Sequence, residues 1–144
     1  MMKKLLTLNK THKDMKDFLH KLIRRGFSDS RRSQWFHVRD AVRAWVLDKG
    51  YTRPLATAED MAADIGIPLD LLCQYIHIVT GKQVLSWRKE LRIFEAQRLM
   101  TDYPDLPFTS IGQMVGIEDK SNFRRQFAEV TGMMPREWRD RRRQ

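Results

Sequence analysis

The chain has 144 residues, of which 42% are hydrophobic and 31% are charged, proportions that are typical of a globular domain. No apolar run reaches membrane-spanning length and the apolar segment at the start is too short for a signal peptide, so we expect a cytoplasmic protein with no membrane span. The net charge of +9 favours a polyanionic partner, nucleic acid before an acidic membrane, and the single cysteine excludes an internal disulfide.

The positive charge is concentrated in the N-terminal third of the chain. Residues 1–50 hold 13 basic and 5 acidic side chains, residues 51–100 hold 6 of each, and residues 101–144 hold 8 basic and 7 acidic. We interpret residues 1–34 as a basic helical extension or linker, residues 35–139 as the main domain, and residues 140–144 as a frayed basic tail that adds non-specific attraction for phosphate.

The first predicted helix covers residues 11–26. Thr11 is placed to cap it, Gly26 to end it, and Met15, Phe18 and Leu22 lie on one face. This apolar face must be buried somewhere. Packing on the chain's own domain, homodimerisation through this helix, and an anionic membrane surface are the alternatives.

A second amphipathic helix precedes the repeated part of the chain. Residues 28–33 are polar and form either a linker or the start of this helix. The apolar stripe that defines the helix ends at Lys49-Gly50 and consists of Trp35, Val38, Val42, Trp45 and Val46.

The most informative feature is an internal repeat. M-A-A-D-I-G-I begins at Met61 and I-G-Q-M-V-G-I begins at Ile111; each leads into a helical stretch that closes on Thr-Gly and is followed by a tryptophan. The copies are 50 residues apart up to their glycines and 51 apart at the Thr-Gly pairs, so the second copy has one extra residue in its turn. Two copies are too few for a solenoid, which indicates paired modules in one unit.

Each copy predicts a helix, a tight turn and a second helix. In the first copy, Thr57 and Asp60 form a capping box for residues 58–65, Gly66 ends that helix, and a second helix covers residues 69–79. In the second copy the helices cover residues 107–115 and 120–130, with Gly116 between them. A long linking helix, stopped by D-Y-P at residues 102–104, would hold the modules at a fixed separation. The sequence therefore predicts an all-α fold of two helix-turn-helix modules.

The motifs of this region resemble those of the AraC/XylS family of bacterial transcription regulators, over residues 36–139. The likeness rests on A-W-V-L-D-K-G-Y, T-A-E-D-M-A-A-D-I-G-I, V-T-G-K, R-K-E-L-R-I-F-E-A-Q-R-L-M, I-G-Q-M-V-G-I-E-D-K-S-N-F-R-R-Q-F and V-T-G-M-M-P-R-E-W-R. Ile117 departs from the aromatic residue that usually follows the glycine of the second turn, but it keeps an apolar contact.

The resemblance implies binding of double-stranded promoter DNA, with the helices 69–79 and 120–130 entering successive major grooves at an asymmetric site. On the second helix we expect Arg124 and Arg125 to contact guanine edges or phosphates and Asn122 to contact adenine or phosphate. Lys120 and Ser121 are expected to contact the DNA backbone. The alternative is that these side chains form a merely solvated basic face.

The first recognition helix is poorer in cations. Its outward residues are Asp70, Cys73, Gln74 and His77. Gln74 could contact adenine and His77 a phosphate, whereas Asp70 would repel phosphate unless it accepts from cytosine or caps its own helix, the alternative that we favour. Either this module contributes little specificity or it binds something other than DNA.

Other functions have less support in the sequence. No nucleophile, acid pair or phosphate loop is visible, and the histidines and Cys73 lack metal-ligand spacing, so we expect neither an enzyme nor a cofactor. The four tryptophans lie on apolar stripes and are expected in the core. The main alternative is a protein-interaction regulator with a degenerate DNA-binding domain. RNA polymerase is the further partner expected of an activator. Three alternatives are open for regulation: the chain is a minimal regulator without an effector domain, it is the C-terminal piece of a longer protein, or its basic N-terminal helix recruits a partner.

Overall fold

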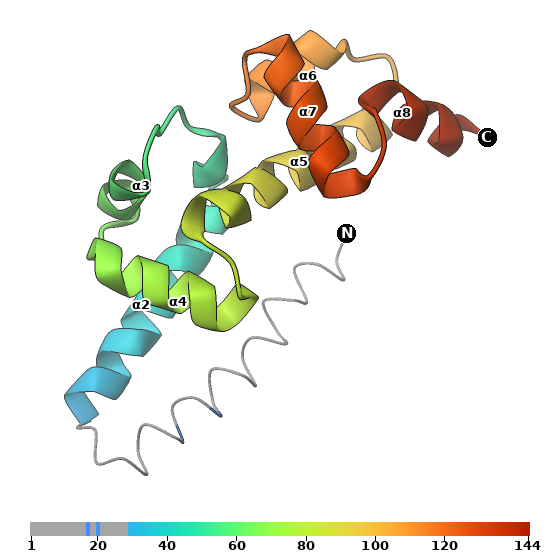
Figure 1. The fold of residues 1–144 in the computed structure, drawn as a ribbon. Coiled ribbons are helices and arrows are strands. Elements are labelled where there is room, and N and C mark those ends of the chain that lie inside the picture. The colour runs from blue at the N-terminus through green and yellow to red at the C-terminus, as the bar shows by residue number, and fades with distance from the viewer. Residues whose placement is uncertain (1–16, 18–19, 21–28) are drawn as a thin grey trace. The chain divides into compact units, whose positions relative to one another are not determined.

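The computed structural model describes residues 17, 20 and 29–144 (Figure 1). Every regular element in these residues is helical, which confirms the predicted all-α class. The predicted helix over residues 11–26 lies outside the described residues, apart from residues 17 and 20. The described part divides into two compact units. The first unit holds residues 29–50 and 55–87, and the second holds Tyr51–Pro54 and Arg88–Gln144.

The first unit is built from three helices that pack on one another. They are α2 (Asp29–Leu47), α3 (Ala58–Ile65) and α4 (Leu69–Thr80). The short 3-10 helix η1 (Gly50–Thr52) lies between α2 and α3 in the sequence, and its last two residues belong to the second unit. The sequence leaves open whether the polar stretch before Trp35 is a linker or the start of a helix. Residues 29–33 belong to α2, so they form the start of this helix. The boundary that we placed between residues 34 and 35 falls inside α2.

Local signals explain where α3 and α4 begin and end. The Thr57 side chain accepts from the Asp60 amide while Asp60 accepts from the Thr57 amide, so the predicted capping box is present. Gly66 follows α3 with φ of 84°, a left-handed conformation that a side chain disfavours. The capping role that we favoured for Asp70 is wrong: Pro68 is the N-cap of α4 and no side chain caps this helix. Asp70 lies in the first turn, where the helix dipole favours a carboxylate.

Trp45 connects the elements of the first unit. Its ring is buried and stacks on that of Trp87, with centroids 5.9 Å apart, and its Nε1 donates to Asp64 Oδ2 over 2.7 Å. Around it the core is closed by apolar residues that include Val42, Leu72 and Ile76, each 1% exposed or less. The tryptophans predicted for the core, Trp35, Trp45, Trp87 and Trp138, are all buried.

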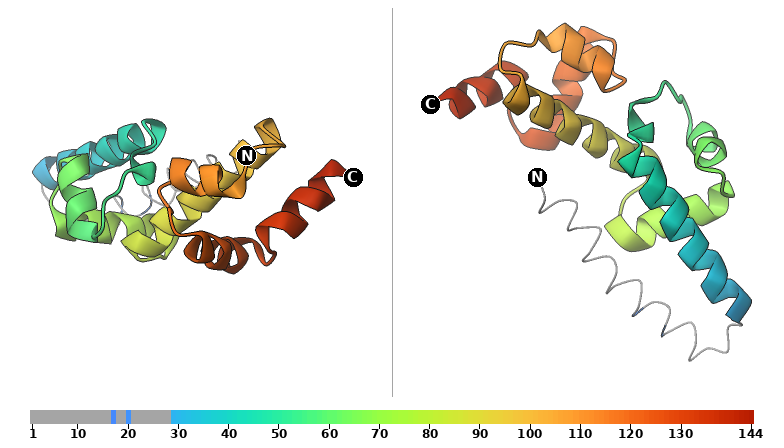
Figure 2. Two further views of the ribbon diagram at one scale, coloured as in Figure 1. Left: turned by 90° about the horizontal axis from the view of Figure 1, so that it is seen from above. Right: turned by 180° about the vertical axis from the view of Figure 1, so that it is seen from behind.

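The second unit contains most of the predicted linking helix and the second module. Helix α5 (Val84–Asp102) is continuous, and the division between the two units falls within it, after Trp87. It is followed by α6 (Phe108–Met114), α7 (Lys120–Thr131) and α8 (Pro135–Arg143). Helix α7 packs on both α6 and α8, as the views in Figure 2 show.

The core of the second unit is a single apolar cluster. Ile111 of α6 and Phe127 of α7 are fully buried, and the rings of Phe127 and of Trp138 from α8 form a T-shaped pair with centroids 6.0 Å apart. Phe123 and Phe127, which we predicted to face the core, are 2% and 0% exposed. These two anchors fix which face of α7 is left for solvent.

The last residues of the chain are helical, which corrects the expectation of a frayed tail. Helix α8 continues to Arg143, whose guanidinium donates to the carbonyl oxygen of Pro104 and pairs with Asp105. Arg139 lies over the Phe108 ring at 4.0 Å and donates to the carbonyl oxygen of Leu106. These contacts attach α8 to the loop between α5 and α6 and to the first residue of α6.

In the part of the chain that the structure describes, no single helix is long and apolar enough to cross a membrane. Helices α3 and α4 together reach the required length and composition, but the chain bends by 97° between them.

Candidate nucleic-acid interface

The two recognition helices have the same length and the same end. Helices α4 and α7 both contain 12 residues and both close on a left-handed glycine, Gly81 and Gly132. Aligned from these ends, Leu72 matches Phe123 and Ile76 matches Phe127, and all four are 2% exposed or less. The extra residue of the second copy lies in the turn, where Glu118 and Asp119 stand in place of Pro68. The two copies of the repeat therefore fold into the same helix-turn-helix scaffold.

The outward side chains of the two helices differ. In the same alignment Cys73 corresponds to Arg124, Gln74 to Arg125, and Asp70 to Ser121. All six side chains are exposed, as are His77 on α4 and Lys120 on α7. The structure thus places every predicted contact residue on the solvent side of its helix, with Asn122 partly buried. Residues 55–81 contain four carboxylates and neither Lys nor Arg, so phosphate attraction is available on α7 and is missing from α4.

The start of α7 is fixed by its own cap. Asp119 Oδ1 accepts a hydrogen bond from the backbone N–H of Asn122 over 2.6 Å, which satisfies one of the free backbone N–H groups of the first turn. The preceding turn contains Gly116 with φ of 85° and the buried Ile117, 3% exposed. Ile117 therefore keeps the apolar contact expected in place of the aromatic residue.

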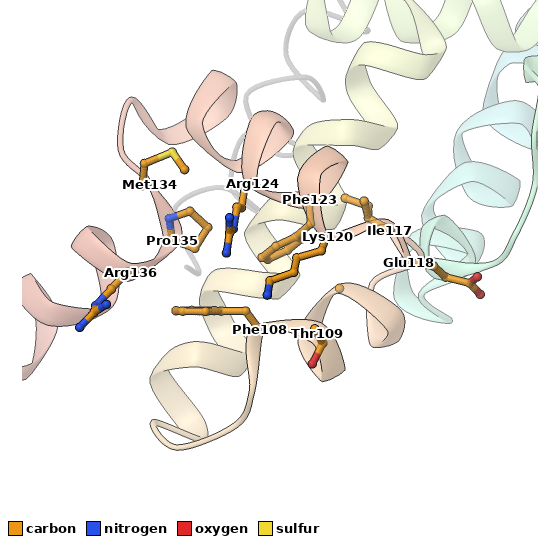
Figure 3. A pocket seen from close by; sticks show the side chains of 11 residues that line it. Phe108, Thr109, Ile117, Glu118, Lys120, Phe123, Arg124, Met134, Pro135 and Arg136 are labelled. Atoms are coloured by element: carbon orange, nitrogen blue, oxygen red, sulfur yellow. The ribbon is translucent and has the colours of Figure 1, made fainter.

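A hollow of about 320 Å³ lies beside the start of α7. Figure 3 shows Lys120 and Arg124 pointing into it from α7, with Phe108 and Thr109 of α6 and Pro135 of α8 around it. The side chains of Lys120 and Arg124 form no ion pair or hydrogen bond with any described residue, so both cations are available to an anionic ligand. Glu118 and Arg136 lie at the edges and point outward (Figure 3).

Three polar residues that line the hollow were not selected from the sequence: Thr109, Glu118 and Arg136. A signal for Arg136 was present, because Pro135 is favoured in the first turn of a helix and places the next residue at that helix start. Thr109 lies near the start of α6 and carried no comparable signal.

Arg125 has partners within the protein. Its Nη1 pairs with Glu129 Oε1 at 2.9 Å and its Nη2 donates to Asn122 Oδ1 at 2.6 Å. Glu129 also pairs with Lys89 of α5 at 3.0 Å, and these contacts lower the pKa of the Glu129 carboxyl, the hydrogen bond from Lys89 most of all. Arg125 is therefore held by partners on its own helix, whereas the Arg124 side chain is not.

Two helix-turn-helix modules, one with an exposed cationic recognition helix, define a helix-turn-helix DNA-binding domain. A family model described as a helix-turn-helix domain matches residues 61–141, more than half of the chain. The arabinose operon regulatory proteins of Escherichia coli K12 and Salmonella typhimurium are each 39% identical to this chain over 59 residues, or 41% of it. The chain belongs to the AraC/XylS family of transcription regulators.

The aligned part is 20% of the Escherichia coli protein and 21% of the Salmonella protein, so the chain spans about a fifth of these relatives. Among solved structures, the C-terminal domain of AraT, a response regulator from Geobacillus stearothermophilus, superposes with a TM-score of 0.63 at 23% identity. That likeness covers 73% of this chain and 84% of the other, and it establishes the fold.

Proposed function

We propose that this chain regulates transcription in the bacterial cytoplasm by binding a specific sequence of double-stranded promoter DNA. The supporting observation is α7: two buried phenylalanines fix its orientation, and its opposite face exposes Lys120, Arg124 and Arg125. A helix of this kind, preceded by a glycine turn, is suited to read base edges in a major groove. Helix α7 is the main reading element of the proposal.

Four exposed residues of α7 contact DNA in this proposal. Arg124 and Arg125 contact guanine edges or phosphates, and Lys120 and Ser121 contact the backbone. Lys120 and Arg124 point into the hollow and, together with Thr109 at its border, would contact one stretch of DNA backbone. Helix α4 enters a successive major groove with Gln74 towards adenine and His77 towards phosphate, at a site that is not a palindrome.

The experiment compares the native chain with Arg124→Ala/Arg125→Ala in an electrophoretic mobility shift assay. The probe is a duplex selected by the native chain from a randomised library, with a scrambled duplex as competitor. We expect the double change to weaken specific binding by about tenfold or more and to lower the salt slope by about two. Arg141→Ala/Arg142→Ala removes the same charge from the end of α8 and is the matched control, expected to retain the sequence preference.

Two outcomes would contradict the proposal. If the native chain binds only without sequence preference, it is not a specific regulator. If the double change on α7 leaves the specific shift intact, α7 is not the reading helix. A run-off transcription assay on a promoter that carries the selected site then distinguishes activation through RNA polymerase from repression by its exclusion.

The lack of cations in residues 55–81 supports a second candidate function, in which the domain binds a protein partner through its first module. The Gln74→Ala and His77→Ala variants test it. Unchanged DNA affinity and unchanged sequence preference in both variants would support the protein-binding function for α4, and a loss at one defined base pair would refute it.

A further inference from the structure

Arg125 is held from both sides by residues of its own helix. Glu129, four residues later, accepts from Nη1 at 2.9 Å, and Asn122, three residues earlier, accepts from Nη2 at 2.6 Å. The side chain is nevertheless 64% exposed. An exposed arginine normally samples many rotamers, whereas these two acceptors favour one orientation of the guanidinium plane.

Glu129 is itself anchored by a different helix. Its Oε1 faces Arg125 and its Oε2 accepts from Nζ of Lys89 on α5 at 3.0 Å, so each carboxylate oxygen has its own cation. Lys89 is 40 residues away in sequence. The orientation of Arg125 is therefore set by the packing of α7 on α5 as well as by α7 alone.

Asn122 takes part through its amide oxygen. This atom accepts from Arg125 and also from Nε2 of Gln126 at 3.0 Å, which uses both of its acceptor positions. A bidentate contact of asparagine to adenine requires the oxygen and the nitrogen together. In this arrangement Asn122 supports Arg125, and only its amino group is left for DNA.

The donors left on Arg125 suit a particular base. Each terminal nitrogen of the guanidinium carries two N–H groups, and the contacts with Glu129 and Asn122 use one on each nitrogen. One donor on each nitrogen is left, which matches the two acceptors, O6 and N7, that guanine presents in the major groove.

We propose that Glu129 is a positioning residue that sets the DNA sequence specificity of α7 by holding Arg125 for a bidentate contact with guanine. This inference rests on the proposed function of the chain. Lys89 holds Glu129 in place from α5, and Asn122 closes the other side of the guanidinium.

A carboxylate on a DNA-reading helix has opposite effects on two quantities. Its charge repels phosphate, so removing it strengthens binding to any DNA. It also orders Arg125, so removing it weakens the preference for guanine at one position. A merely structural salt bridge would change both affinities in the same direction. The ratio of specific to non-specific affinity therefore identifies the positioning role.

The test compares Glu129→Gln with the native chain on the selected duplex and on duplexes in which each guanine in turn is replaced by adenine. We expect discrimination at one guanine to fall about tenfold while binding to scrambled duplex tightens by about threefold. Lys89→Met keeps the Arg125–Glu129 pair but releases its anchor, and we expect a smaller loss at the same guanine.

Glu137→Gln is the matched control. Glu137 pairs with Arg141 on α8 at 2.8 Å with the same four-residue spacing, so this variant makes the same change in charge outside α7. If Glu129→Gln keeps the discrimination shown by Glu137→Gln, the positioning role is refuted while the proposed function stands. If the native chain has no sequence preference, the proposed function and this inference both fail.

Discussion

Arg92 Nε donates to the carbonyl oxygen of Tyr51 over 2.6 Å, and this bond joins residues 41 positions apart. Nη2 of the same side chain donates to the carbonyl oxygen of Arg53 at 2.8 Å. Arg92 is 7% exposed, and its burial lowers the pKa of its guanidinium to about 10, which leaves it charged at neutral pH. The segment Tyr51–Pro54 is thus attached to α5 by a buried cation.

We therefore expect Arg92→Leu to destabilise the fold. It leaves two backbone carbonyls without their donors, at a cost of about 2–4 kcal/mol in the free energy of unfolding. Urea denaturation followed by circular dichroism measures the change. Arg136→Leu is the control, because the Arg136 side chain is 89% exposed, and it should shift stability by less than about 0.5 kcal/mol. Equal unfolding midpoints for the two variants would contradict the role of Arg92.

The repeated glycines give a matched pair of substitutions. Gly66 and Gly116 have φ of 84° and 85°, so Gly66→Ala and Gly116→Ala each incur about 1 kcal/mol of left-handed strain. At Gly116 an added Cβ would also lie 2.6 Å from the Thr52 carbonyl oxygen and 3.1 Å from the Arg92 guanidinium, whereas at Gly66 it meets nothing within 4 Å.

We expect Gly116→Ala to cost about 2 kcal/mol more than Gly66→Ala, since the backbone and a bonded guanidinium must move. Thermal denaturation of the two single variants under one set of conditions makes the comparison. Equal losses of stability would show that the clash at Gly116 is relieved without cost.

Tyr51 predicts how stability responds to alkaline pH. Burial and the nearby Glu95 carboxylate raise the pKa of its phenol from 10.0 to about 12. Between these values the unfolded chain loses a proton that the folded chain keeps, so Tyr51 lowers stability as pH rises from about 10 to about 12 and has no effect below that range.

Replacing Tyr51 with Phe should remove this contribution, so stability should fall less, or rise more, between pH 10 and pH 12 than in the native chain. Tyr75, whose pKa burial raises, and Arg92, whose pKa burial lowers, contribute in both proteins. Urea unfolding at a series of pH values measures the slope. Equal slopes in the two proteins would show that the Tyr51 phenol has the same pKa in the folded chain as in the unfolded chain.

Short-range signals predicted most of the scaffold. The capping box at Thr57, the glycine turns and the apolar stripe of α7 each involve residues a few positions apart, and the helices begin and end within a residue or two of where these signals place them. The predicted contact residues lie on exposed faces because helical periodicity fixes direction. Their contact with DNA stays a prediction.

The features that sequence reasoning missed depend on contacts between distant residues. Arg92 lies on a helix rich in charge, and its burial follows from the backbone of Tyr51 packing against it. Glu129 was not selected from the sequence, because its pair with Lys89 depends on the position of α5 beside α7. The periodicity of a single helix shows that Arg92 and Glu129 are polar residues, but it does not show which distant residues they contact.

Whether α4 lies against DNA can be decided by adding charge. Gln74 is exposed and occupies the position that Arg125 occupies on α7, so Gln74→Arg gives the first module a cation where the second has one. If α4 enters a major groove, this variant should bind duplex more tightly, and the salt slope should steepen by about one. Fluorescence anisotropy at several salt concentrations measures both quantities.

Gln34→Arg supplies the control for this experiment, since it makes the same substitution at an exposed position of α2 in the same unit. It raises the net charge equally, so any difference between the two variants reports on position alone. A steeper slope for Gln74→Arg than for Gln34→Arg would place α4 near phosphates. Identical slopes would mean that the carboxylate-bearing first module does not contact DNA, and specificity would then rest on α7.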